Sequence, residues 1–157
     1  MVAGDSYNMH NDNKVLLMSI KSIYANQIFN GTKKYEFRRK SLGESNLDKK
    51  IYIYSSQKDK AIVGYFFVSR ILKGNIDYLL NITGYNNGDD RKSLVDYFQD
   101  CPECHALEIS NPIRLKRPIL LSKLKRLIPH INIPQYYRYI KDNDSLYDIL
   151  NYNETSE

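Results

Sequence analysis

The sequence predicts an α+β fold, with a mostly antiparallel, barrel-like β-sheet and short flanking helices. The expected elements run in the order strand, helix, three strands, helix and strand, and neighbouring strands are separated by short turns typical of hairpins. The chain has 157 residues, of which 42% are hydrophobic, enough for one ordinary core. We therefore expect one domain over residues 14–141, a flexible arm over residues 1–13 and an acidic, mobile tail over residues 142–157.

The first half of the chain predicts one helix among four strands. The apolar run "KVLLMSI" (14–20) is typical of a buried strand. In "KSIYANQIFNG" the apolar residues follow helical spacing, and Gly31 lies just past the expected helix end. The alternating segment "KKYEFRR" (33–39) predicts the second strand. Two further runs, "KIYIYSS" (50–56) and "AIVGYFFVSRIL" (61–72), predict a strand pair joined by a turn.

The second half predicts two short helices and two extended segments. "NIDYLL" (75–80) and "RKSLVDYFQD" (91–100) are helical patterns on either side of a loop rich in glycine and asparagine. "HALEISNPIRL" (105–115) predicts a strand that Pro112 breaks, and "PHINIPQYYRYI" (129–140) is extended at its prolines. No apolar run approaches the roughly 18 to 20 residues that span a bilayer, and the start lacks a signal-peptide pattern. We therefore expect a cytoplasmic protein without membrane contact.

Charge is spread unevenly along the chain, whose formal net charge is +5. Residues 33–40 carry five basic groups and one acid, residues 113–126 carry six basic groups and no acid, and residues 142–157 carry five acids and no base. This distribution favours a polyanion-binding surface, with nucleic acid as the partner. A basic composition without any partner is the alternative, in which the segment 113–126 is a solvated face.

The segment "CPECH" (101–105) contains a C-x-x-C-H spacing. It is compatible with covalent haem attachment, half of a zinc site, a redox dithiol or chance spacing in a turn. A structural zinc site needs four ligands, and the sequence offers only His10, His105 and His130 to complete the two cysteines. We favour chance spacing, and predict no metal and no cofactor.

Three segments of the chain resemble the ASCH family (activating signal cointegrator homology), whose fold is a PUA-like β-barrel. The first contains a G-x-K-x-x-E-x-R signature as Gly31, Lys33, Glu36 and Arg38. The second is the strand pair with a central glycine, Gly64, and the third is "IPQYYRYI", which resembles the closing segment of the family. Together they cover roughly residues 14–141. The resemblance implies that the signature and the closing segment border one cleft.

The same residues suit single-stranded nucleic acid, above all RNA or a modified base. Arginine presents a planar fork to phosphate, and tyrosine offers a face for base stacking. On a strand, Tyr35 and Phe37 share one side while Glu36 and Arg38 share the other, so one face packs inward and the other carries charge. For Tyr35 and Phe37, a place in the core is the favoured interpretation over ligand contact. For Glu36 and Arg38, an internal ion pair is the alternative to ligand binding. The predicted nucleic-acid-binding residues are Lys21, Lys33, Tyr35, Glu36, Arg38, Arg39, Gln135, Tyr137 and Arg138.

The resemblance also implies enzymatic alternatives, because ASCH-like proteins include hydrolases of modified nucleosides and ribonucleases. In the amidohydrolase branch the signature lysine works with a hydroxyl residue and with an acid on a later strand. Here Lys33 matches, but Glu36 replaces the hydroxyl, and Tyr65 stands in the run where the acid is expected. We therefore favour a binding module over an enzyme that uses Lys33 and Glu36 as catalytic residues. A regulatory module that reads a protein or metabolite, for example in transcription regulation, is the third possibility.

Overall fold

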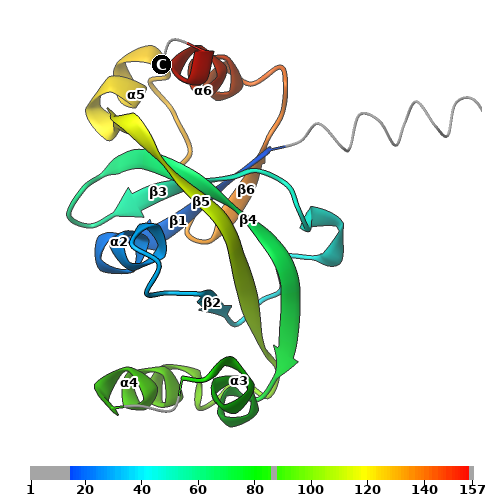
Figure 1. Cartoon of the computed structure of the whole chain (residues 1–157). Helices are drawn as coiled ribbons and strands as arrows, with labels where there is room; N and C mark the ends of the chain where they lie inside the picture. Colours follow the sequence, from blue (N-terminus) through cyan, green and yellow to red (C-terminus); the bar gives the residue numbers. More distant parts are fainter. Residues whose placement is uncertain (1–14, 86–87, 156–157) are drawn as a thin grey trace, which may run out of the picture. The chain divides into compact units, whose positions relative to one another are not determined.

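The computed structural model describes residues 15–85 and 88–155, and the arm predicted over residues 1–13 lies outside them (Figure 1). The described chain is α+β, as predicted. Its strands are β1 (Val15–Lys21), β2 (Tyr35–Arg38), β3 (Ile51–Ser56), β4 (Ala61–Gly74), β5 (Cys104–Leu120) and β6 (Tyr137–Ile140). Its helices are α2 (Ser22–Phe29), α3 (Ile76–Thr83), α4 (Gly88–Phe98), α5 (Leu121–Leu127) and α6 (Ser145–Thr155), with a 3-10 turn, η1 (Glu44–Asn46).

The six strands form one mixed sheet in the order β2-β5-β4-β3-β1-β6. β1 pairs with β3 in parallel, whereas the pairs β1–β6, β2–β5 and β3–β4 are antiparallel. The described strands leave β2 and β6 as the two edges, so the sheet is not closed and the predicted barrel is wrong. Closure depends on which strands pair at long range, and the short-range hairpin signals of the sequence carry no information about that.

The strand β1 is buried on both faces, which explains its unbroken apolar sequence. Leu16, Leu17 and Met18 are all 0% exposed although successive side chains point to opposite faces. A parallel partner requires a crossover connection, and the chain between β1 and β3 contains α2. Behind α2, Gly31 has a φ of +86°, as expected for a glycine that ends a helix.

At Gly64 the strand β4 lies very close to β5 and α2. A Cβ placed there would lie 2.4 Å from the carbonyl oxygen of Ile113 and 2.5 Å from the ring of Phe29. Only a glycine leaves room for β5 and α2 at this point, which explains the central glycine of the predicted strand pair. The strand β5 itself runs through Pro112, so the predicted break is wrong; Asn111 adopts a φ of +49° instead, and the strand continues.

Contacts divide the chain into two compact units, each with its own core. Unit 1 comprises residues up to Thr32, Lys49–Phe67 and residues from Asn111 onward; unit 2 comprises Lys33–Asp48 and Val68–Ser110. The core of unit 1 includes Leu17, Tyr52, Ile62, Leu115, Ile119 and Leu124. The core of unit 2 includes Phe37, Leu79, Leu80, Phe98 and Ala106, and α3 contacts α4. The boundaries proposed for the domain at residues 14–141 stay a prediction.

The acidic end of the chain is largely helical rather than a mobile tail. Residues Ser145–Thr155 form α6, and Leu146 and Leu150 are buried in the unit 1 core. The predicted mobility is therefore wrong for this helix. The two leucines lie four residues apart, which is the spacing of one helix face, but the acids around them dominate the composition of the segment. No helix of the described chain is long and apolar enough to cross a membrane.

Candidate nucleic-acid interface

The edge strand β2 places successive side chains on two opposite faces, as strand alternation predicts. Phe37 stands opposite Ala106 of β5, and both belong to the unit 2 core. Its ring meets Tyr85 edge-on with the centroids 5.4 Å apart. Glu36 and Arg38 lie on the other face. Phe37 is thus a core residue, and the charged face is the part of β2 that is available for chemistry.

Lys33, Glu36 and Arg38 form a compact ion cluster, which we call the β2 cluster. Lys33 Nζ lies 3.4 Å from Glu36 Oε1, and Arg38 donates from Nη2 at 2.8 Å and from Nε at 3.0 Å to Glu36 Oε2. The side chains of Lys33 and Glu36 are 9% and 8% exposed, and that of Arg38 is 20% exposed. Two cations share one carboxylate, so the cluster keeps one net positive charge, and Arg38 is its most accessible member.

Arg39 points to α4 instead of joining the β2 cluster. Its Nη2 donates to the backbone oxygen of Tyr97, and its guanidinium lies 5.1 Å from the Tyr97 ring centroid and 5.7 Å from that of Phe98. Tyr97 is 64% exposed. An arginine against an exposed tyrosine is an arrangement suited to base stacking. Tyr97 is not among the predicted residues, because a helical pattern does not indicate which distant cation contacts it.

Tyr35, predicted to contact nucleic acid, directs its hydroxyl to Glu108. The hydroxyl donates to Glu108 Oε2 at 3.1 Å; Ser69 donates to Oε1 at 2.8 Å and Arg70 donates to Oε2 at 2.8 Å. The hydrogen bonds from Ser69 and Arg70, with a smaller contribution from Tyr35, hold the pKa of the Glu108 carboxyl below its ordinary value. This network pairs β2 with β4 and β5 inside unit 2.

His105 of unit 2 lies beside the signature, although it is distant from the signature in the sequence. It stands directly opposite Arg38 in the β2–β5 register, so the two side chains share a face of the sheet. His105 is 8% exposed, its Nε2 lies 3.8 Å from Glu103 Oε1, and its Nδ1 has no hydrogen-bond partner among the described residues. The motif "CPECH" suggested His105 as a metal ligand. Its place opposite Arg38 follows instead from the register between β2 and β5, which the motif does not indicate.

Unit 1 brings Lys21 and the closing segment to one end of the β1–β6 pair. Ser19 donates from its hydroxyl to the Pro134 oxygen at 2.6 Å and from its backbone to the Tyr136 oxygen at 2.9 Å. Lys21, two residues further along β1, is exposed, and so is Gln135. The ammonium of Lys21 and the amide of Gln135 are therefore presented close to the same strand ends.

The remaining predicted residues of β6 divide over two faces. Tyr137 lies opposite Met18, and its ring centroid is 6.0 Å from that of Tyr139; burial raises the pKa of the Tyr137 hydroxyl. Arg138 lies on the other face, where it donates to the Asn132 oxygen at 2.9 Å and to Asp144 Oδ2 at 3.0 Å. Arg138 thus holds the chain on both sides of β6. That the β2 cluster and this segment line one cleft stays a prediction.

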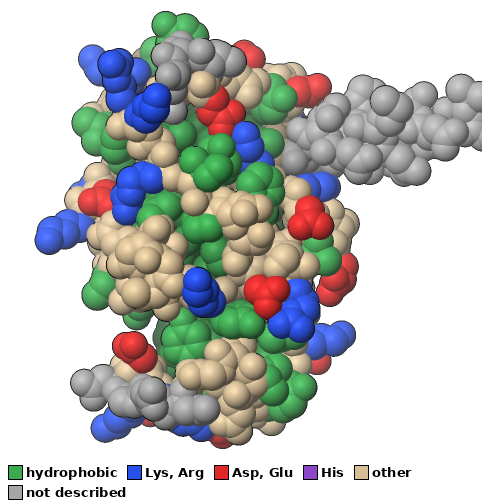
Figure 2. Space-filling view, viewed as in Figure 1, with side chains coloured by type: hydrophobic (Ala, Val, Ile, Leu, Met, Phe, Trp, Pro, Cys, Tyr) green, Lys and Arg blue, Asp and Glu red, His purple; other side chains and the backbone are tan. Residues whose placement is uncertain are grey.

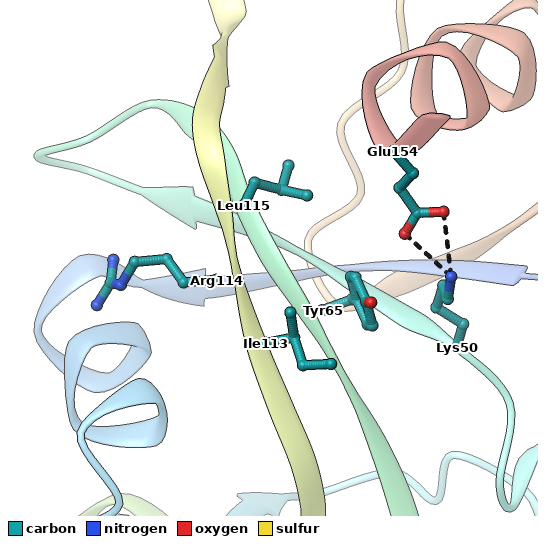
Figure 3. A pocket seen from close by; sticks show the side chains of 6 residues that line it. All are labelled: Lys50, Tyr65, Ile113, Arg114, Leu115 and Glu154. Atoms are coloured by element: carbon teal, nitrogen blue, oxygen red, sulfur yellow. Dashed lines mark hydrogen bonds and ion pairs between the residues drawn. The ribbon is translucent and has the colours of Figure 1, made fainter. Parts of the chain in front are cut away.

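A small cavity in unit 1 is lined by none of the predicted residues (Figure 3). Its volume is about 260 Å³. Lys50 donates to both oxygens of Glu154, at 3.0 and 3.2 Å, and lies 4.4 Å from the Tyr65 ring centroid. Arg114 points away from these groups toward α2, where its guanidinium lies 4.5 Å from the ring centroid of Phe29 (Figure 3). Lys50 is thus paired with Glu154, and both Lys50 and Arg114 lie against aromatic rings. These contacts make the cavity poorly suited to a charged ligand.

The two cysteines do not gather a metal-ligand set. The described residues contain no group of three or more His, Cys, Asp and Glu side chains that could hold a metal ion. Cys104 is fully buried in the unit 2 core, and burial together with a hydrogen bond to Cys101 raises the pKa of its thiol to about 12. His10, considered above as a ligand, lies outside the described residues.

Known proteins share this fold. The crystal structure of ASCH from Zymomonas mobilis matches with a TM-score of 0.74 at 23% identity, covering 87% of this chain and 94% of that chain. Human THYN1, solved in complex with DNA containing 5-methylcytosine, matches with a TM-score of 0.57 at 12% identity, covering 90% of this chain and 98% of that one. Both likenesses extend over most of this chain and of the neighbour, so the chain has the same fold as these proteins.

A comparison of sequences adds a related protein to these structural neighbours. The chain is 26% identical over 136 residues to an ASCH domain-containing ribonuclease from Zymomonas mobilis, which covers 85% of this chain and 89% of the relative. No family model matches the chain. The chain is thus similar over most of its length to an ASCH domain-containing protein, in line with the resemblance carried by its G-x-K-x-x-E-x-R signature.

Proposed function

We propose that the protein is an ASCH domain protein that binds single-stranded RNA, with the β2 cluster of unit 2 as its phosphate site. The observation that carries the proposal is the sharing of Glu36 by Lys33 and Arg38 on an edge strand. Glu36 holds both cations in position before any ligand binds. The remaining positive charge and the planar guanidinium suit a phosphodiester, which accepts paired hydrogen bonds from arginine.

Exposed tyrosines supply the second requirement of single-strand binding, a surface for the bases. In unit 2 this is Tyr97 with Arg39 against it, and in unit 1 it is Tyr139, 36% exposed, beside Tyr137. Each stacked base contributes about 1–3 kcal/mol with little dependence on sequence. Lys21 and Gln135 add an ammonium and an amide at the strand ends of unit 1.

The relatives support nucleic acid as the ligand. The Zymomonas relative is described as a ribonuclease, and THYN1 was crystallised with DNA containing 5-methylcytosine. Single-stranded RNA is preferred here because the sequence match to the ribonuclease covers most of both chains. Transcription regulation, the third possibility raised by the sequence, gains no support from these relatives.

Fluorescence anisotropy with a labelled single-stranded RNA tests the phosphate site through two variants. Glu36→Gln removes the competing negative charge, while the amide oxygen of Gln can still accept hydrogen bonds that position the cations. The folded fraction of this variant should therefore bind RNA as tightly as or more tightly than the wild type. Glu36→Gln/Arg38→Gln removes the cation as well, and RNA affinity should then fall at least about tenfold, equivalent to 1.4 kcal/mol. Equal affinities of the two variants would contradict the proposal. Single-stranded DNA and duplex DNA with 5-methylcytosine, measured in parallel, identify a different preferred nucleic acid.

RNA cleavage is a second candidate function, favoured by the match to the Zymomonas ribonuclease. RNA cleavage requires a group that transfers protons. The imidazole of His105 can serve as this group because it stands opposite Arg38 on β5. In this scheme the 2′-oxygen of a ribose attacks the phosphorus, the bond from phosphorus to the 5′-oxygen breaks, and a cyclic phosphate forms. His105 takes the proton of the 2′-hydroxyl and passes it to the leaving 5′-oxygen, while Arg38 and Lys33 stabilise the negative charge on the non-bridging phosphate oxygens.

A cleavage assay separates this candidate from binding alone. Wild type should cut a labelled single-stranded RNA but not the same RNA carrying 2′-O-methyl groups, in parallel reactions with a chelator and with added Mg²⁺. His105→Ala should slow cleavage about 100-fold or more while RNA affinity stays unchanged. Cleavage that persists with the 2′-O-methyl RNA, or that His105→Ala leaves intact, would refute this role.

A further inference from the structure

The α5 surface is a strongly basic part of unit 1, and none of the residues discussed as the RNA site belongs to it. We define it by five exposed cations on two neighbouring segments: Lys58, Lys60, Lys123, Lys125 and Arg126. Residues 109–141, which contain α5, include eight Lys and Arg and no Asp or Glu. In Figure 2, Lys and Arg side chains gather over α5 at the upper left of the view.

A backbone hydrogen bond holds the two segments of the α5 surface together. The first residue of α5, Leu121, donates from its N–H to the oxygen of Lys60 at 2.9 Å, so the β3–β4 turn lies against the start of the helix. Leu124 is 0% exposed and faces the unit 1 core. The cations at positions 123, 125 and 126 are exposed on the rest of this short helix.

The acid within the turn does not neutralise these cations directly. Asp59 stands between Lys58 and Lys60, but its Oδ2 accepts a hydrogen bond from the Ser55 hydroxyl at 2.7 Å. Its backbone N–H donates to the hydroxyl of Ser22 at 3.0 Å. Asp59 is thus engaged by the serines at the end of β3 and the start of α2, and the turn presents two ammonium groups beside α5.

Helix stability alone does not explain the charges. Lys125 and Arg126 lie in the last turn of α5, where a cation interacts favourably with the helix dipole. Lys123 lies near the first turn, which contains no acid, and there a cation is unfavourable. Lys58 and Lys60 belong to no helix. Three of the five cations therefore do not stabilise a helix through its dipole. The clustering of all five on one surface favours an anionic partner.

We propose that the α5 surface binds the phosphate backbone of RNA, as a second contact besides the β2 cluster. The five side chains that define the surface are four ammonium groups and one guanidinium, with no aromatic ring among them, so the surface suits phosphates rather than bases. This contact is independent of base sequence, and it depends strongly on salt because each neutralised phosphate releases counterions. The inference rests on the proposed RNA-binding function, but it assigns affinity to a different group of residues.

The salt dependence of RNA binding tests the α5 surface. The variant Lys123→Gln/Lys125→Gln/Arg126→Gln removes three cations from α5. Its matched control, Lys73→Gln/Lys92→Gln/Lys141→Gln, removes three exposed cations elsewhere and changes the net charge equally. Anisotropy titrations of both, of wild type and of Glu36→Gln/Arg38→Gln are made with a labelled single-stranded RNA between 50 and 300 mM salt.

For a single strand, the slope of log K against log salt changes by about 0.7 for each phosphate contact. The α5 variant should therefore lose up to about 2 from the magnitude of its slope, and bind at least about tenfold more weakly at physiological salt. The control should keep a slope within about 0.5 of wild type. This pattern supports the α5 surface whether or not the β2 double variant also loses affinity.

Two other patterns overturn the inference and differ in what they say of the proposed function. If α5 variant and control behave alike while the β2 double variant loses binding, the α5 surface is not a contact and the proposed phosphate site stands. If wild type shows no RNA binding at any salt, both the α5 surface and the proposed function fail. Circular dichroism of every variant verifies that the loss of affinity is not a loss of folding.

Discussion

Arg38 holds the carboxylate of Glu36 with two nitrogens, Nη2 at 2.8 Å and Nε at 3.0 Å, both directed to Oε2. The other oxygen of Glu36 lies 3.4 Å from Lys33. One largely buried acid thus orders two cations on the short edge strand β2. The charges of the signature are mutually dependent, so single substitutions within it affect both folding and any bound anion.

Replacing Glu36 by Gln should destabilise the fold because Lys33 and Arg38 lose their shared counter-charge in a poorly solvated position. Breaking a buried ion pair from one side costs about 3–5 kcal/mol, and the remaining amide hydrogen bonds favour the lower part of that range. Urea denaturation followed by circular dichroism measures the change. Glu103→Gln, an exposed acid in the same unit, is the control and should shift stability by no more than about 0.5 kcal/mol. Equal stabilities of the two variants would show that Glu36 is not structurally required.

Glu108 should make the stability of the protein depend on pH in the acid range. Hydrogen bonds from Ser69 and Arg70 keep the pKa of Glu108 below its ordinary value of 4.5 in the folded state. Because the folded pKa is the lower one, the stabilisation is fully present above about pH 4.5, and it is lost as the pH falls through the folded pKa. Wild type should therefore exceed Glu108→Gln in unfolding free energy between pH 5.5 and 7, and the difference should shrink toward pH 3. A difference that stays constant over this range would contradict the assignment.

The packing of α6, which replaces the mobile tail that we predicted, can be tested by mutation. Leu150 is 2% exposed in the unit 1 core, so Leu150→Ala leaves a cavity and should lower the unfolding free energy by about 2–5 kcal/mol. Asp148→Ala, on the exposed side of the same helix, should cost less than about 1 kcal/mol. Urea denaturation of both variants decides between a packed helix and a dispensable tail. A tail would leave Leu150→Ala as stable as Asp148→Ala.

Local patterns predicted the fold well where short-range chemistry decides the structure. The run around Leu16 is a buried strand, Gly31 follows the end of α2, and Phe37 faces inward, each as its neighbours in sequence required. Open or closed sheet topology was not predictable in this way, because β2 and β6 reveal nothing about whether they pair. The helical spacing of Leu146 and Leu150 was present, but five acids obscured it in the composition.

The candidate site shows the same division between local and long-range information. The ion pairing of Glu36 with Arg38 follows from strand alternation, and we anticipated it as one reading of these residues. The partners of Arg39 and Tyr35 did not follow, since Tyr97 and Glu108 come from distant segments. His105 became relevant only through its register opposite Arg38. The register between two strands depends on how they pair in three dimensions, so the spacing of residues along one strand does not predict it.

Cys104 should be almost inert toward thiol reagents in the native protein. Burial and the hydrogen bond to Cys101 raise the pKa of its thiol to about 12, so its thiolate fraction at pH 8 is on the order of one in 10,000, compared with about one in four for a free cysteine. Cys101 is partly exposed. Titration with Ellman's reagent at pH 8 should therefore detect one rapidly reacting thiol per native chain, and two in denaturant. In Cys101→Ser the rapid reaction should disappear. A fast reaction of Cys104 in that variant would restore the redox or metal reading of "CPECH", because both chemistries need an ionised, accessible thiol at this position.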